Sequence, residues 1–259
     1  MRYLYPLFRL YSQVVKAVAA VKIPYKMRAI TLTSLGKTLL GMTDSDFGLM
    51  IKPLCEYKTL NDFFTREIDL KQREIHNNSI IAPCEGRIIG CGPIQNGKTL
   101  TQVKGITYSL DNLILNNAVT DHFKNGSFCN IYLSPRNYHR FHLPCSGTIE
   151  YIKHIPGACY PVNDIGLKIP GLYTLNERYI VIIKNDQFRI CMAIVGAAAV
   201  RRINILKRQG DKVSKGELLG MFQMGSSIVI ISDKKIFTDP NVLMGEIKVL
   251  GQILQRDES

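Results

Sequence analysis

The stretches RYIVIIKN (residues 178–185) and FRICMAIVG (residues 188–196) are runs of mainly β-branched and other apolar residues. Such runs favour β-strands. Further runs of the same kind, separated by Gly, Pro and Asn, are IIAPCEGRIIGCG (80–92), FCNIYLS (128–134), SGTIEYIKHIP (146–156), ELLGMFQMG (217–225), SIVIIS (227–232) and GEIKVLGQIL (245–254). This spacing predicts a mostly antiparallel β-sandwich or barrel.

The chain before this β-rich part is different in character. Apolar residues recur at helical spacing and predict two amphipathic helices, over about 3–20 and 25–41. A third helix is expected over 44–53, and TLNDFFTR (59–66) is expected to begin a short one. The predicted fold class is therefore α+β, with N-terminal helices followed by a β domain of the barrel-sandwich-hybrid type.

The charge of this N-terminal segment is one-sided. No acidic residue precedes Asp44, and seven basic residues do: Arg2, Arg9, Lys16, Lys22, Lys26, Arg28 and Lys37. Basic amphipathic helices suit the surface of an anionic membrane, although a helical hairpin packed on the core has the same periodicity. We expect residues 1–66 to form a helical membrane-associating segment and residues 67–259 the β-rich domain.

Composition narrows the class of protein. The chain has 259 residues, 46% of them apolar, and a net charge of +12 from 33 basic and 21 acidic residues. The charge favours a polyanionic partner, either nucleic acid or acidic lipid, and no nucleic-acid signature is present. No apolar run approaches the roughly 18 residues of a membrane-spanning helix. Seven scattered cysteines without a CxxC motif indicate free thiols in a reducing compartment and no zinc site.

Three short motifs could carry chemistry. His139 and His142 lie in SPRNYHRFHLP (134–144), where they could act as catalytic bases, form a metal pair or make structural hydrogen bonds. Ser226 follows Gly225 between two β-rich runs, which is also the pattern of a plain turn. Glu85 lies in the turn PCEG, where it could orient a histidine or simply face solvent.

In this order, the motifs resemble those of the phosphatidylserine decarboxylase family. The resemblance covers nearly the whole chain and includes LNDFFTR (60–66), the PCEG turn, YLSPRNYHRFH (132–142) and Gly225-Ser226-Ser227. Members of this family make a covalent pyruvoyl cofactor from an internal serine. The resemblance implies an enzyme that converts phosphatidylserine to phosphatidylethanolamine and CO₂, through a Schiff base between the substrate amine and the pyruvoyl ketone.

The resemblance also implies roles for individual residues. Ser226 would attack the carbonyl group of Gly225, and cleavage would give a β chain (1–225) and an α chain (226–259) with the pyruvoyl group at its start. His142 matches the family base, Glu85 the acid that orients it, and His139 the histidine of the decarboxylation step. Anionic membrane is the expected partner, with a peripheral position on the cytoplasmic face of the cell membrane, no metal and no nucleic acid; a homo-oligomer is left open.

The sequence departs from the family pattern at its acid turn. The family usually has Asp in this turn, and Glu85 has a side chain longer by one methylene group. An orienting hydrogen bond spans only about 2.6–3.2 Å, so the longer side chain requires a different rotamer or a shifted turn. This departure supports one alternative, an uncleaved, inactive family member. A separate alternative is a biotinyl- or lipoyl-like carrier or scaffold domain that binds acidic lipid. A carrier needs a lysine at its hairpin tip, where this chain has Gly225 and Ser226.

Overall fold

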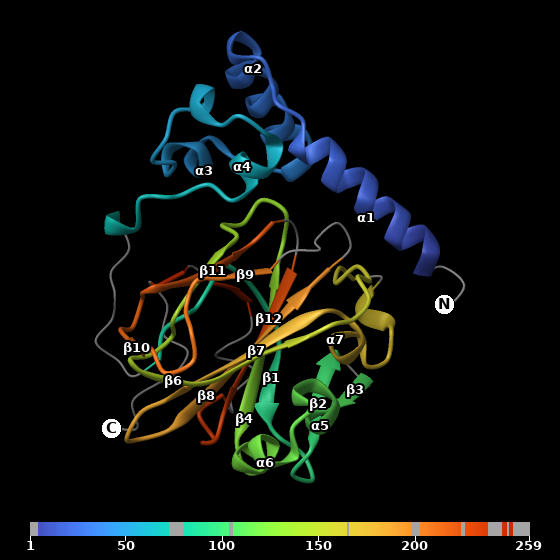
Figure 1. Ribbon diagram of the computed structural model, residues 1–259, viewed down its shortest axis with the longest axis vertical. Helices are drawn as coiled ribbons and strands as arrows, with labels where there is room; N and C mark the ends of the chain where they lie inside the picture. Colours follow the sequence, from blue (N-terminus) through green and yellow to red (C-terminus); the bar gives the residue numbers. More distant parts are fainter. Residues whose placement is uncertain are drawn as a thin grey trace.

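The computed structural model describes residues 5–72, 80–103, 106–164, 166–197, 203–223, 226–237, 245–247 and 249–250. A helical segment forms one end of the molecule, and a β domain forms the rest (Figure 1). The described part of the chain confirms the α+β class, with N-terminal helices followed by mainly antiparallel sheets.

The helical segment contains α1 (Tyr5–Ala20), α2 (Tyr25–Leu35), α3 (Asp44–Gly48) and α4 (Leu60–Phe64). A π-helical turn, Gly36–Leu40, continues α2, and 3-10 turns occupy Leu54–Glu56 and Leu70–Gln72. Helices at the first two predicted positions are confirmed. The third is shorter than expected, because the chain leaves α3 at Gly48 and Met50 then forms an isolated β-bridge with Ile68.

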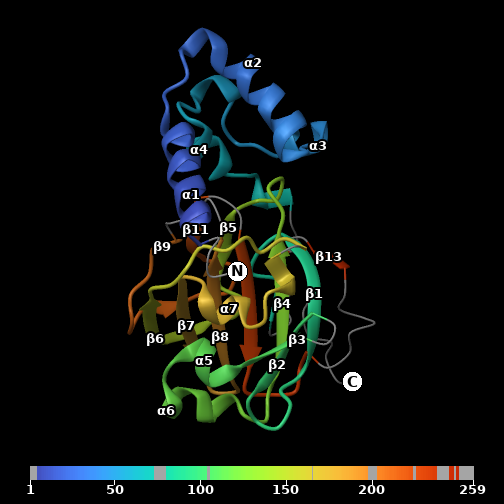
Figure 2. The same cartoon turned by 90° about the vertical axis from the view of Figure 1, so that its right-hand side faces the viewer.

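The helical segment has a small hydrophobic core of its own. The aromatic rings of α4 lie at its centre, and Phe63 and Phe64 are almost fully buried. The other members come from all parts of the segment: Ala19, Leu32, Leu40, Met42, Tyr57 and Leu60. Thr59 caps α4 by accepting a hydrogen bond from the Asp62 backbone N–H at 3.0 Å. This core holds α4 between the other helices and the β domain (Figure 2).

The β domain is built on an eight-stranded antiparallel sheet with the order β10-β6-β7-β8-β12-β4-β1-β13. These strands are β1 (Gly86–Pro93), β4 (Ser127–Leu133), β6 (Gly147–Ile155), β7 (Arg178–Lys184), β8 (Arg189–Gly196), β10 (Lys212–Val213), β12 (Ser226–Ser232) and β13 (Gly245–Ile247). The sheet is open, because no pairing closes β10 onto β13 within the described residues. The barrel alternative is therefore not found, and the strands form packed layers.

Both faces of the large sheet are covered. One face packs against a small sheet of β5 (Arg140–His142), β11 (Leu218–Phe222) and β9 (Ile203–Ile205). The opposite face packs against the hairpin of β2 (Thr99–Val103) and β3 (Ile106–Ser109) and against short helices. These helices are α5 (Leu110–Ile114), α6 (Asn117–Thr120) and α7 (Leu172–Leu175), with 3-10 turns at Asp121–Phe123 and Gly166–Lys168. Strand β12 is therefore buried on both sides.

Within the small sheet, β11 lies very close to the strands on either side of it at Gly220. A Cβ atom there would lie 2.1 Å from the Asn204 carbonyl oxygen, so only glycine fits without a shift of the backbone. The Phe141 ring covers this point and packs against Phe222, with ring centroids 4.8 Å apart. Both rings belong to the core between the two sheets. Phe141 thus joins β5, which carries His142, to the large sheet.

We expect Phe141→Ala to lower the free energy of unfolding by about 3–5 kcal/mol, because it leaves a cavity beneath β5. The measurement is urea unfolding, made in chains that also carry Ser226→Ala so that a single intact species is compared. Leu206→Ala is the control, because Leu206 is 48% exposed. The role of Phe141 is wrong if the two substitutions destabilise the protein equally.

Candidate active site

The loop between β4 and β5 is shaped by Asn137. The Oδ1 atom of Asn137 accepts hydrogen bonds from the backbone N–H of Ser134 at 2.8 Å and from its hydroxyl group at 2.7 Å. The amide side chain thereby closes a tight turn, which Pro135 suits because its ring restricts φ. The loop presents Tyr138 and His139 and then enters β5, where His142 is the last residue.

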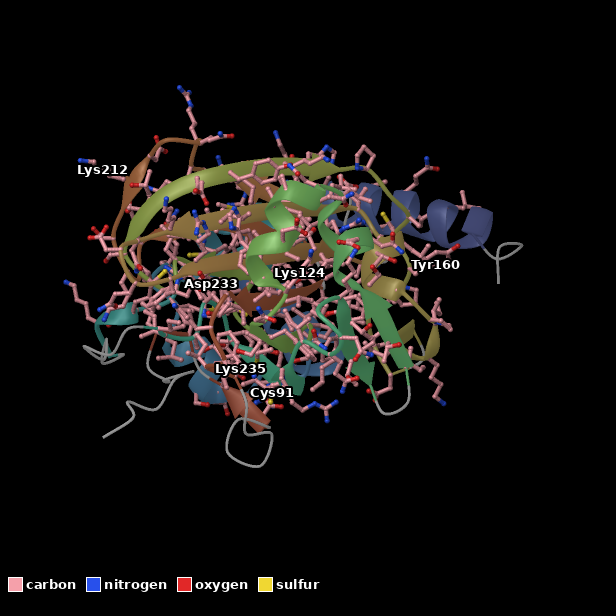
Figure 3. The ribbon with its side chains drawn as sticks, turned by 90° about the horizontal axis from the view of Figure 1, so that it is seen from below. Cys91, Lys124, Tyr160, Lys212, Asp233 and Lys235 are labelled. Atoms are coloured by element: carbon pink, nitrogen blue, oxygen red, sulfur yellow. The ribbon has the colours of Figure 1, made fainter. Side chains whose placement is uncertain are left out.

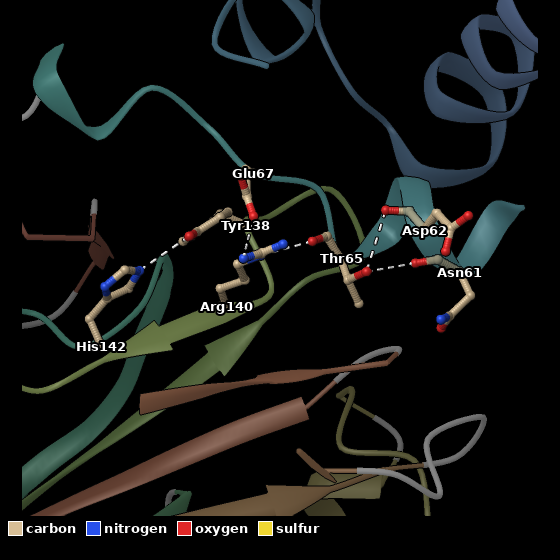
Figure 4. Close-up of polar contacts among 7 residues, drawn as sticks. All are labelled: Asn61, Asp62, Thr65, Glu67, Tyr138, Arg140 and His142. Atoms are coloured by element: carbon tan, nitrogen blue, oxygen red, sulfur yellow. Dashed lines mark hydrogen bonds and ion pairs between the residues drawn. The ribbon is translucent and has the colours of Figure 1, made fainter. Parts of the chain in front are cut away.

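His142 is buried and is held at both ring nitrogens. Nδ1 lies 2.9 Å from the carbonyl oxygen of Gly216, which can only accept, so Nδ1 carries the proton. Nε2 lies 3.2 Å from the Tyr138 hydroxyl group (Figure 4). Burial lowers the pKa of His142, the nearby Arg140 lowers it further, and the Gly216 carbonyl opposes this. The imidazole is therefore neutral near pH 7, and Nε2 has a lone pair available to a proton donor.

Glu85 is buried in the turn before β1 and contacts the same loop. Its Oε2 atom accepts a hydrogen bond from the backbone N–H of Tyr138 at 3.1 Å. The Tyr138 hydroxyl group in turn reaches His142. The backbone N–H of His142 also bonds to the Pro83 carbonyl at 2.7 Å, so the acid turn and the histidine strand are tied together. Glu85 can thus influence His142 through Tyr138, a residue that the sequence motifs did not single out.

His139 is fully buried and is packed against the helical segment. Its ring lies on Phe64 of α4, with centroids 4.0 Å apart. Nδ1 bonds to the Asn137 carbonyl at 2.8 Å, whereas Nε2 has no hydrogen-bond partner in the described part of the chain. The pKa of His139 is lowered to about 3, chiefly by burial; the Asn137 carbonyl opposes this shift, and the charge of Arg66 adds to it. Nε2 is therefore an unprotonated acceptor in a buried position.

Ser226 is the first residue of β12 and lies beside the start of the loop between β4 and β5. It pairs with Leu133, the last residue of β4, and with Gly196 of β8. Side chains alternate along a strand, so Ser226 shares a face with Ile228, which packs in the core beneath β5. Its hydroxyl group is fully buried and has no hydrogen-bond partner among the described residues. This orphaned hydroxyl lies on the side of the sheet that carries His142.

The segment before Ser226 is anchored at the other end of the loop. The backbone N–H of Phe222 bonds to the His139 carbonyl at 2.9 Å. The predicted cleavage point therefore lies between Phe222, which is bonded to His139, and Ser226, which pairs with Leu133. Gly225 itself lies outside the described residues.

Two arginines connect the loop to the segment after α4. Arg66 donates from Nη2 to the carbonyl groups of Arg136 at 2.6 Å and Asn137 at 3.3 Å. Arg140 donates to the Thr65 carbonyl at 2.9 Å and pairs with Glu67 at 2.8 Å (Figure 4). These contacts explain why the motif LNDFFTR accompanies the histidine motif, a link that spacing along the chain does not reveal.

Comparison with known proteins identifies the family. The sequence profile of the family described as "Phosphatidylserine decarboxylase" matches residues 60–255, which contain all four predicted site residues. The chain belongs to the phosphatidylserine decarboxylase family. The resemblance stated from the motifs is thus confirmed, and the protein is an enzyme of a pyruvoyl-dependent lyase family.

Several curated relatives are similar over most of this decarboxylase-family chain. A phosphatidylserine decarboxylase proenzyme of Acinetobacter baumannii is 32% identical, covering 93% of this chain and 89% of the relative. Proenzymes of Acinetobacter baylyi and Psychrobacter cryohalolentis are each 33% identical over 216 residues, or 77% and 76% of this chain and 75% and 78% of the relatives. Family membership favours an enzyme over the carrier alternative.

We expect the free energy of unfolding to decrease as the pH falls from about 6.5 towards 3, because His139 stays neutral when folded and takes up a proton when unfolded. More than about one pH unit above 6.5 neither state is protonated, so this dependence vanishes. Denaturation of uncleaved Ser226→Ala chains between pH 5 and 7.5 measures the slope, to which one histidine contributes at most about 1.4 kcal/mol per pH unit. His139→Gln should reduce the slope, and His122→Gln, at an exposed position, should not. Equal slopes for both variants would contradict the assignment.

Proposed function

We propose that this protein decarboxylates phosphatidylserine to phosphatidylethanolamine after making a pyruvoyl group from its own Ser226. The observation that supports this most directly is the buried Ser226 hydroxyl group, which has no partner in the described structure. The Ser227 hydroxyl group is also unpartnered there, but of the two only Ser226 lies on the face of β12 that packs towards β5. Ser226 lies at the start of β12, beside the loop that carries His139 and leads to His142. A buried hydroxyl without a hydrogen bond is costly, and such groups are concentrated at reactive sites.

Self-cleavage begins at Ser226. Its Oγ atom attacks the carbonyl carbon of Gly225, and the peptide bond is exchanged for an ester. β-Elimination then breaks the Cβ–Oγ bond, leaving a carboxylate on Gly225 and a dehydroalanine at position 226. Hydrolysis of the dehydroalanine releases ammonia and leaves the pyruvoyl group. The β chain is then residues 1–225 and the α chain residues 226–259.

His142 acts as the base in this proposal. A serine hydroxyl is a weak nucleophile until a neighbouring group accepts its proton. His142 suits this role because burial keeps its imidazole neutral and Gly216 places the proton on Nδ1, leaving Nε2 to accept. The Tyr138 hydroxyl group bonds to Nε2 and can relay the proton. Glu85 orients the assembly through its bond to the Tyr138 backbone.

His139 serves the decarboxylation step. The pyruvoyl group supplies a ketone that reacts with the substrate amine and draws electrons as CO₂ leaves. The Nε2 atom of His139 is a buried acceptor without a hydrogen-bond partner in the described structure, and the Ser226 hydroxyl group at the start of β12 is also buried and unpartnered. The polar groups that this chemistry needs are therefore present. Because burial keeps the His139 imidazole neutral, its Nε2 atom accepts a hydrogen bond from the amino group of the serine headgroup and positions it for the reaction.

The helical segment, residues 1–66, attaches the enzyme to anionic membrane. Of twelve large apolar side chains that are exposed in the described structure, nine lie in this segment and each is more than half exposed. They are Leu10, Val14, Val18, Val21, Tyr25, Met27, Ile30, Leu39 and Ile51. The first three lie on one face of α1, Val21 follows directly after its end, and the segment is strongly basic. Such a surface binds at a lipid interface, peripherally and on the cytoplasmic leaflet, which carries acidic lipid.

None of the described helices is long and apolar enough to cross a membrane.

Intact mass tests self-processing. We expect the wild-type protein to give two chains, one ending at Gly225 and one beginning with a blocked residue 226, and we expect decarboxylation of phosphatidylserine. Ser226→Ala removes the nucleophile and should leave one chain of about 29.2 kDa without activity. Ser227→Ala is the matched control, because Ser227 is equally buried on the opposite face of β12, and it should still be cleaved.

The same assay examines Glu85. Glu85→Asp should preserve or speed cleavage, and Glu85→Ala should slow it, since the Tyr138 backbone loses its acceptor. Normal maturation of Glu85→Ala would rule out the orienting role. An uncleaved wild-type chain would support the alternative of an inactive family member.

Vesicle sedimentation tests the membrane role. Replacing Val14, Val18 and Ile30 by Ser should weaken binding to phosphatidylserine-containing vesicles at least about tenfold, because less apolar surface enters the interface. The control replaces Leu115, Leu175 and Leu206, which are similarly exposed but lie in the β domain. Deletion of residues 1–43 should abolish most of the binding. Equal loss in both triple variants would show that the helical segment is not the membrane-binding surface.

A further inference from the structure

A cleft of about 410 Å³ lies between the end of the helical segment and the first residue of β5, Arg140. Four basic and three acidic side chains line it, together with Tyr57 and Thr65. Arg66 and Arg140 come from the α4 junction and from β5, and Lys52 and Lys58 come from the helical side. The volume is in the range of sites that bind small molecules.

Arg66 carries a positive charge, and the carboxylates of Glu85 and Asp46 act on it without forming a salt bridge to it. Its side chain is only 3% exposed, and it forms no salt bridge to any described residue. Nη2 is used by two carbonyl groups of the loop, but Nε and Nη1 have no acceptor in the described part of the chain. The Phe63 ring supports the guanidinium group from one side, at 5.7 Å. A buried guanidinium with unused donors is costly unless an anion accompanies it.

Tyr57 adds a second unsatisfied donor. Its hydroxyl group is buried, lines the same cleft and has no acceptor among the described residues. Burial raises the pKa of Tyr57, and the charge of Arg66 partly opposes this shift. Lys52 and Lys58 are exposed at the same cleft and add two positive charges. These groups are donors and positive charges, which is what the oxygens of a phosphate group require.

Two of the acidic side chains in the cleft already have donors of their own. Glu67 pairs with Arg140 at 2.8 Å. The Oδ2 atom of Asp62 accepts the backbone N–H of Lys58 at 3.2 Å. Glu56 is the third acid, and it is exposed. Neither Glu67 nor Asp62 pairs with Arg66. With four basic and three acidic side chains, the lining of the cleft carries a small excess of positive charge.

The cleft is connected to His139 through one peptide group, that of Asn137. The Asn137 carbonyl accepts from Nη2 of Arg66 and from Nδ1 of His139. A phosphate bound at Arg66 would thus be linked to the His139 ring through that one carbonyl oxygen. The lipid headgroup is a phosphodiester bonded to serine, so its phosphate must lie a few bonds from the amine that reacts.

We propose that this cleft binds a phosphate group, with Arg66 as its floor and Tyr57, Lys52 and Lys58 as further donors. The assignment of that phosphate to the headgroup of the lipid substrate rests on the function proposed above. The same chemistry would accept free inorganic phosphate, and the experiment separates the two sources.

Binding is measured on the uncleaved Ser226→Ala chain, so that turnover plays no part. Calorimetry with inorganic phosphate and with soluble glycerophosphoserine gives the dissociation constants. Lys52→Gln with Lys58→Gln should weaken both about tenfold, and Tyr57→Phe should weaken them a few fold while keeping the packing. Arg66→Lys should weaken them too, but it also disturbs the loop, so the conclusion depends on the other variants.

The control is Lys212→Gln with Lys235→Gln, which makes the same change in net charge. Both lysines are exposed on the β domain and are labelled in Figure 3, which views the molecule from the end opposite the helices. This pair should leave both dissociation constants within about twofold. If the cleft variants behave like the control, or if neither compound binds, the proposed phosphate site is wrong.

Competition identifies the source of the phosphate. If the lipid headgroup occupies the cleft, inorganic phosphate competes with short-chain phosphatidylserine in neutral micelles, and the Lys52 and Lys58 substitutions raise KM more than they lower kcat. If phosphate binds in the cleft without competing, the site serves free phosphate and the link to the substrate is wrong. Cleft-dependent binding in a protein that never decarboxylates would overturn the proposed function and leave the phosphate site standing.

Discussion

Asn137 is the point on which the arrangement of the site depends. Its side chain closes the turn at Ser134, and its carbonyl group accepts hydrogen bonds from both His139 and Arg66. One residue thereby connects the end of β4, a candidate catalytic imidazole and the helical segment. Because that residue is largely buried, its contacts cannot be exchanged for water without loss of free energy. The positions of the neighbouring groups follow from it.

The second constraint is electrostatic. Burial lowers the pKa of both histidines, and each directs Nδ1 at a backbone carbonyl group, so each is a neutral imidazole with Nε2 as its acceptor atom. A carbonyl selects the tautomer without adding a charge, whereas a directly bonded carboxylate would favour the protonated ring. Contact with Glu85 through Tyr138 fits this arrangement. It also explains how a side chain longer than the usual Asp can be accommodated there.

The helical segment contributes to the site as well as to the surface. Phe64 packs on His139, and Arg66 and Glu67 contact the loop and β5. Lipid that perturbs α4 would therefore act directly on the position of a candidate catalytic ring. The cleft at Arg66 lies in this same junction, between the apolar surface proposed to meet the membrane and the loop that carries the chemistry.

The amino-acid sequence by itself determined the α+β class, the positions of the first two helices and the family, because these depend on local periodicity and on motifs read along the chain. It did not indicate that α3 would end at Gly48, or that the strands would form an open sheet. Arg66 and Tyr138 lie within motifs that carry the resemblance, but no local pattern gave either of them, or Gly216, a role in the site. Only the tertiary structure decided their roles, because Arg66 meets Arg136 across 70 residues, and His142 meets Gly216 across 74. Contacts that bridge such separations are set by how strands and helices pack, and no local pattern records them.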